Sequence, residues 1–99
     1  MSTNGGAMQV TTEVVDVTNL SNAGHHVWDP AANTDIDNPQ AVSVIGQEDP
    51  TYDITWDHVN GDRFHVTEVN DTGDGTGGVQ DVASGTDIGE VKLRVEGRR

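Results

Sequence analysis

Four histidines, His25, His26, His58 and His65, are the side chains of this sequence best suited to acid–base chemistry or metal binding. A zinc site needs three or four ligands that converge on one point. His25 and His26 are adjacent, so they point apart in an extended chain, and His58 and His65 fall on opposite faces of the hairpin predicted below. We therefore expect ordinary surface or edge histidines and no zinc site.

A second candidate for chemistry is the acidic, glycine-rich stretch at 70–75, where oxygen-bearing side chains alternate as in a calcium loop. The predicted cation ligands are Asn70, Thr72, Asp74 and, at the twelfth position, Asp81. The expected flanks are strands rather than helices, and the last ligand is not the usual glutamate. A specific site and a hairpin loop that holds hydrated Ca²⁺, Na⁺ or K⁺ loosely both fit the pattern, and we expect no other cofactor.

Nucleophilic and nucleotide chemistry have no support in the sequence. The serines lie in no nucleophile elbow, and cysteine is absent. No glycine motif follows a strand and opens a helix. Carboxylates are so numerous that surface solvation accounts for them, and no catalytic pair stands out. We expect no enzyme activity.

The charge of the chain limits which partners it can bind and indicates the salt concentration at which it works. The chain has 99 residues with 17 acidic and 5 basic side chains, a formal charge of −12, and Lys92 is its one lysine. A nucleic-acid face needs clustered lysine and arginine, so we expect no nucleic-acid partner. At molar salt the Debye length falls to about 3 Å, which screens the repulsion among carboxylates. The composition resembles that of proteins from extremely halophilic archaea and their viruses, and we interpret the acidity as adaptation to solvent.

The elements that would position these residues are strands. Apolar residues recur with a period of two, and Gly, Asn, Asp and Pro interrupt the chain at short intervals. The sequence predicts an all-β fold, a small antiparallel β-sandwich or barrel of about six or seven short strands with long loops. The clearest predicted strands are 8–17, 41–45, 51–58, 63–69 and 90–96, and 79–83 is a candidate for a further short strand. In 90–96 the alternation predicts that apolar side chains face inward, Val91, Leu93 and Val95, and that charged ones face outward, Glu90, Lys92, Arg94 and Glu96. A single β domain would span residues 8–96, between an N-terminal arm, 1–7, and a basic tail, 97–99.

One hairpin can be predicted in detail, around Val59-Asn60-Gly61. A two-residue turn would put Phe64 on the face opposite Trp56, because a slip of one residue flips every side chain. A three-residue loop with Gly61 in the left-handed conformation places aromatic and branched residues together. The resulting pairs are Ile54 with Val66, Trp56 with Phe64, and Asp57 with Arg63. We predict the three-residue loop.

The core that these strands can bury is thin. Hydrophobic residues make up 32% of the chain and aromatic residues 4%, below the ordinary apolar share. A domain of this size buries only about 60–65% of its unfolded surface, so a partner surface, bound ions or high salt would complete it. For the segment 29–40, partner contact and a solvated connection are both open. The residues expected at an interface are Met1, Ser2, Thr3, Asn4, Arg98 and Arg99.

These features together predict a non-enzymatic structural protein of a haloarchaeal virus particle. We expect a capsid decoration or vertex-type subunit, or another virion assembly subunit, made in the host cytoplasm and present in many copies among the other protein chains of a large assembly. No run of about 18 apolar residues is present, so no membrane insertion is expected, and the first residues lack a signal peptide's basic and apolar regions. The alternatives are a soluble halophilic cytoplasmic binding module, which a deep apolar pocket would favour, and a cation-dependent surface or adhesion domain.

Overall fold

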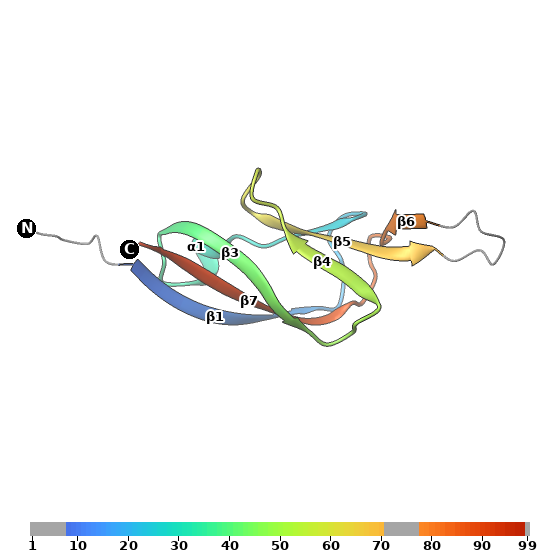
Figure 1. The fold of residues 1–99 in the computed structure, drawn as a ribbon, viewed down its shortest axis with the longest axis horizontal. Helices are drawn as coiled ribbons and strands as arrows, with labels where there is room; N and C mark the ends of the chain where they lie inside the picture. The colour runs from blue at the N-terminus through green and yellow to red at the C-terminus, as the bar shows by residue number, and fades with distance from the viewer. Residues whose placement is uncertain (1–7, 71–77, 99) are drawn as a thin grey trace, which may run out of the picture.

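The structure, a computed structural model, describes residues 8–70 and 78–98. Seven strands and one helical turn lie within these ranges. They form two antiparallel sheets packed against each other (Figure 1), so the predicted small all-β fold is confirmed. In chain order the elements are β1 (Met8–Val17), β2 (His25–Val27), α1 (Pro30–Asn33), β3 (Asn38–Gln47), β4 (Tyr52–Trp56), β5 (Arg63–Asn70), β6 (Gly78–Asp81) and β7 (Gly89–Arg98).

Sheet A has the strand order β1-β7-β3. Its central strand, β7, alternates as the sequence predicts: Val91, Leu93 and Val95 are completely buried, while Lys92 and Arg94 are exposed. All ten residues of β1 pair with β7 without a shift in register. The centre of the sheet is thus the last strand in sequence, so the sheet depends on contacts between distant parts of the chain.

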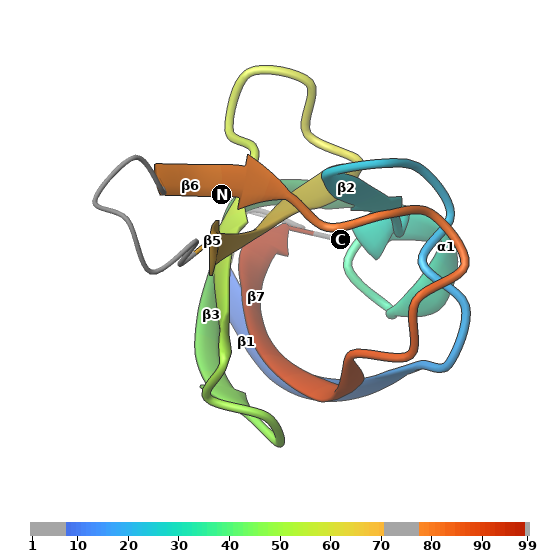
Figure 2. The same ribbon diagram turned by 90° about the vertical axis from the view of Figure 1, so that its right-hand side faces the viewer.

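Sheet B is built around β5, which pairs with β4 along one edge. β2 and β6 share the other edge, because β2 pairs with residues 63–65 and β6 with residues 67–70. Figure 2 shows the curved strands β1 and β7 lying beneath β2, β5 and β6. The buried residues between the layers form one cluster: Val17, Leu20, Ile36, Val42, Ile54, Trp56, Phe64, Val66, Val82, Ile88, Val91, Leu93 and Val95.

The predicted register of the β4–β5 hairpin is confirmed. Trp56 pairs with Phe64 and Ile54 with Val66, and Gly61 has a φ of 79°, which suits a residue without Cβ. The backbone N–H of Asp57 donates to the Arg63 carbonyl over 3.1 Å, so these two residues are opposite each other as expected. Their side chains form other contacts, however: the Arg63 guanidinium lies 3.2 Å from Asp62.

Two elements of the structure were not predicted. β2 has three residues, too few to show a period of two. The helical turn α1 lies inside the segment 29–40, where we expected a loop, because Asp29 accepts hydrogen bonds from the N–H groups of Ala31 and Ala32 over 3.0 and 3.4 Å. Pro30 follows this N-cap with a backbone angle already suited to a helix.

Two strands also extend beyond their predicted ends. β3 begins at Asn38 and passes Pro39 at an irregularity in its pairing with β7, where a missing N–H is tolerated. β7 continues through Gly97 to Arg98, residues that we placed in a tail. Gly97 is buried, since a Cβ at this position would lie only 2.6 Å from Cγ2 of Ile36. The lack of a side chain therefore lets the α1–β3 connection close over the end of the sheet.

Candidate functional site

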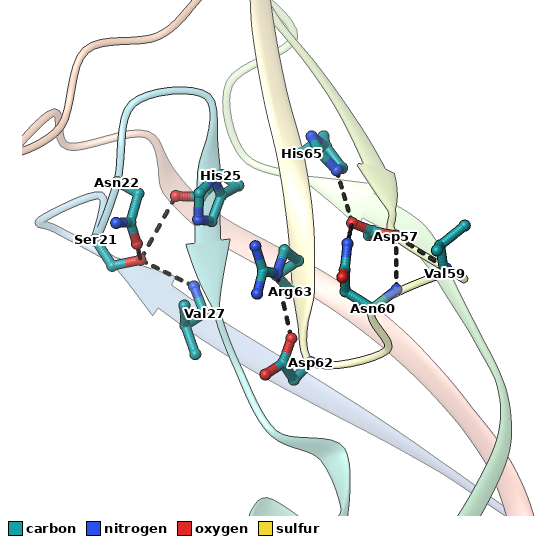
Figure 3. A network of polar contacts seen from close by, with 10 residues as sticks. All are labelled: Ser21, Asn22, His25, Val27, Asp57, Val59, Asn60, Asp62, Arg63 and His65. Atoms are coloured by element: carbon teal, nitrogen blue, oxygen red, sulfur yellow. Dashed lines mark hydrogen bonds and ion pairs between the residues drawn. The ribbon is translucent and has the colours of Figure 1, made fainter.

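The outer face of sheet B carries a polar network centred on Asp57 (Figure 3). One carboxylate oxygen, Oδ1, accepts from the N–H groups of Val59 and Asn60 over 2.9 and 3.1 Å. The other, Oδ2, accepts from the Asn60 side-chain amide over 2.7 Å and lies 2.9 Å from Nε2 of His65. These contacts tie the turn of the β4–β5 hairpin to β5.

Asp57 is therefore best understood as the anchor of a turn. Hydrogen bonds from the side chain and N–H of Asn60, followed by the one from His65, hold the pKa of Asp57 well below its ordinary value. General acid–base chemistry needs a group that titrates near the working pH, and this carboxylate does not. Within residues 8–70 and 78–98, no hydroxyl group bonds to His65, although a bond of that kind is what pairs a base with a nucleophile in covalent catalysis.

His25 and His26 lie on opposite faces of β2. The ring of His25 is 6.2 Å from that of His65 on the outer face, whereas His26 packs against Phe64 with ring centroids 5.5 Å apart. Burial and then the neighbouring charge of His25 lower the pKa of His26, and its Nδ1 accepts the N–H of Ser21 over 3.1 Å. In the described part of the chain, no three carboxylate or imidazole groups are arranged to hold a metal ion.

The predicted cation ligands lie at the β5–β6 end of sheet B. The backbone of Asn70 pairs with Gly78, and Asp81 pairs with Thr67, three residues further along the ladder. That separation is roughly 10 Å, and the Asp81 carboxylate lies against Gly24, where a Cβ would be 2.6 Å from Cγ. The other two ligands, Thr72 and Asp74, fall outside the described residues, so the site stays a prediction.

Of the residues expected at an interface, the structure describes one. Arg98 is exposed at the end of β7, where it pairs with Met8 on one side and Asn38 on the other. Residues 1–4 and Arg99 lie outside the described ranges, and their predicted contacts stay predictions.

The outer face of β7 and β1 gathers most of the positive charge of the chain. Lys92, Arg94 and Arg98, three of the five basic residues, point outward from β7 together with Glu90 and Glu96. Beside them on β1 lie three exposed apolar side chains, and we call this set the basic–apolar face. Those apolar residues are Met8, Val10 and Val14, exposed at 49%, 54% and 56%.

The register sets an apolar residue beside a charged one along this face. Val10 pairs with Glu96, and Val14 pairs with Lys92. The long stem of a charged side chain can cover such a neighbour while its head stays in water. Sequence reasoning identified the outward charges of β7 but missed the face, because the alternation within each strand does not reveal that β1 lies next to β7.

The basic–apolar face has a shallow hollow of about 310 Å³ near one end. Val14, Lys92 and Gly46 lie across the three strands at this level, and the missing side chain of Gly46 leaves the space open. A second hollow, of about 500 Å³, lies between β1 and the α1–β3 connection, where its lining includes Glu13 and Asp35. Small-molecule sites usually bury most of the ligand's surface, whereas both of these hollows are open to solvent on one side.

Comparison with protein-family models, with curated proteins and with solved structures finds no match for this chain. Within residues 8–70 and 78–98, no helix has the length and apolar character needed to cross a membrane.

Proposed function

We propose that this chain is a non-enzymatic structural subunit that assembles with other protein chains at high salt through its basic–apolar face. The observation that carries the proposal is the gathering of Lys92, Arg94 and Arg98 beside exposed Val and Met side chains, in a chain with a formal charge of −12. Charge complementarity guides the choice of partner, and apolar area supplies affinity. Asp16, Glu90 and Glu96 on the same outer face balance the three basic residues, so this face has no net charge in a chain of −12 and repels an acidic neighbour less than the rest of the surface does on average.

In its specific form, the proposal places the chain in the particle of a haloarchaeal virus, as a decoration or vertex-type subunit. Support for this form comes from composition: the charge suits molar salt, where a Debye length of about 3 Å lets many acidic subunits pack together. A thin core also favours a protein that is completed by its neighbours. Electron microscopy of the purified protein at molar KCl tests this form, and dispersed single molecules would contradict it.

Sedimentation velocity at molar KCl tests the assembly face itself. We expect the wild-type protein to associate as its concentration rises, and Arg94→Glu to weaken that association at least about tenfold, since the reversed charge faces an acidic neighbour. Arg63→Glu is the matched control, because it makes the same charge change on the outer face of sheet B. A wild-type protein that stays monomeric, or equal losses in both variants, would overturn the proposal.

A further inference from the structure

The two edges of sheet A differ in how they are protected. The edge strand β3 contains Pro39 and two irregularities in its pairing, features that discourage the addition of another strand. The opposite edge strand, β1, runs for ten residues in unbroken register and contains no proline and no lysine. No strand among residues 8–70 and 78–98 pairs with its outer edge. A long, regular edge of this kind offers a row of backbone donors and acceptors to another chain.

We infer that a second copy of this chain pairs with that edge, β1 antiparallel to β1, about a two-fold axis at Thr12. The two A sheets would then join into one continuous six-stranded sheet. The inference rests on the proposed function, to which it adds the identity of one partner and the geometry of the joint. A two-fold axis uses the same patch on both copies, so β1 has to be complementary to itself.

The side chains of β1 satisfy this requirement in one register. With Thr12 opposite Thr12, Val10 of each copy lies opposite Val14 of the other on the outer face, where apolar pairs stabilise a sheet. Thr11 lies opposite Glu13 on the inner face, a pair that can hydrogen bond. Centring the axis on Glu13 would place two glutamates opposite each other, and centring it on Thr11 would lose the Val10–Val14 pairs.

The charges of the neighbouring strand β7 favour the same register. Arg98 lies beside Met8 at one end of the joint, and Glu90 lies beside Asp16 at the other end. The two-fold axis brings Met8 of one copy opposite Asp16 of the second, so the backbones of Arg98 and that aspartate are two strands, roughly 10 Å, apart. The long arginine side chain can reach over Met8 and bring its guanidinium to the carboxylate, close enough for the charges to attract at molar salt. The two Arg94 side chains would be three strands apart, roughly 14 Å, well beyond the Debye length of about 3 Å at molar salt.

Cross-linking through an introduced cysteine tests the register, since the natural chain has no cysteine. Opposite residues in an antiparallel pair have Cα atoms about 4.5–5.5 Å apart, within reach of a disulfide. We therefore expect oxidised Thr12→Cys to form a covalent dimer at molar KCl. Val10→Cys alone should not, because its two copies would be roughly 13 Å apart, but an equal mixture with Val14→Cys should cross-link. Thr55→Cys, exposed on the outer face of β4, is the matched control.

A charge exchange gives an independent readout in sedimentation equilibrium. Arg98→Glu and Asp16→Arg should each raise the dissociation constant of the dimer about tenfold, and the double variant should restore it. If Thr12→Cys cross-links no faster than Thr55→Cys, or the double variant shows no recovery, the inference is overturned. A wild-type protein that still associates through its basic–apolar face in that case would leave the proposed function standing, whereas a monomer would remove both.

Discussion

The outer faces of the two sheets use their polar groups in opposite ways. On sheet B, the carboxylate of Asp57 is occupied by the hairpin turn and by His65. On sheet A, the described contacts of the outward charges of β7 include a single ion pair, from Arg94 to Glu96 at 3.0 Å, and apolar side chains lie exposed beside them. A face whose polar groups already bond one another organises the fold, whereas a face with spare charge and apolar area is suited to a partner.

The largest effect on stability is expected in the buried core beneath the outer face of sheet A. Leu93 is completely buried at the centre of β7, so Leu93→Ala should lower the free energy of unfolding by about 2–5 kcal/mol. Urea denaturation at molar KCl, followed through the fluorescence of Trp28 and Trp56, measures the change. Lys92→Ala, one residue away on the outer face, should change it by no more than about 0.5 kcal/mol. Similar losses in both variants would contradict the separation of core from partner face.

The two sheets also differ in how far the sequence predicts them. The alternation of β7 and the residues of the β4–β5 turn are local signals, so the buried face of β7 and the position of Gly61 both followed from the sequence. The placement of β7 between β1 and β3 arises from pairing over long distances, which alternation within one strand does not encode. For that reason the basic–apolar face was not predicted, although the outward charges were.

The features around sheet B that were not predicted from the sequence have local causes. β2 is too short to show a period, and it places His25 next to His65 only because it pairs with β5. The turn α1 carried a readable signal, Asp29 followed by Pro30, which is typical of a helix start. The predicted pairing of Asp57 with Arg63 was right for the backbone, but charge alone did not reveal that the hairpin turn offers more donors to the carboxylate.

The next effect in size concerns the network on sheet B. Asp57→Ala removes every bond of this carboxylate and should destabilise the protein less than Leu93→Ala but more than Asp53→Ala, a change at an exposed position on the same strand face. Urea denaturation measures all three variants. Equal midpoints for the two aspartate variants would show that the network does not organise the hairpin.

The depressed pKa of Asp57 also predicts the sign of an acid effect. The unfolded chain takes up a proton near the ordinary aspartate pKa of about 3.9, while the folded state resists protonation to lower pH. Stability contributed by Asp57 is therefore present above this pH and is lost as the pH falls below it. Asp57→Ala should have a shallower loss of stability in this range, measured as urea midpoint against pH at constant KCl.

A smaller effect is expected at the glycine of the same turn. Gly61 has a φ of 79°, and a Cβ there would meet no atom within 4 Å. Gly61→Ala should therefore cost about 1 kcal/mol through backbone conformation alone. Gly61→Asn should cost less, since asparagine tolerates the left-handed region. Thermal unfolding at molar KCl distinguishes the two, and a larger loss for Asn than for Ala would show that side-chain contacts rather than φ set the cost.

The smallest expected effect is a change in how stability depends on pH, and it arises at His26. Its folded pKa lies below the value of 6.5 for a free histidine because the ring is partly buried and His25 is adjacent. The unfolded chain therefore binds the proton first as the pH falls through this value, so stability is lost on the acid side. Protonation at Nδ1 would also break the hydrogen bond from Ser21. His26→Gln should make the melting temperature depend less on pH between about pH 7 and pH 5. His58→Gln, at an exposed position in the hairpin loop, is the control for the substitution itself. Equal slopes in all three proteins would show that the buried face of sheet B is indifferent to this charge.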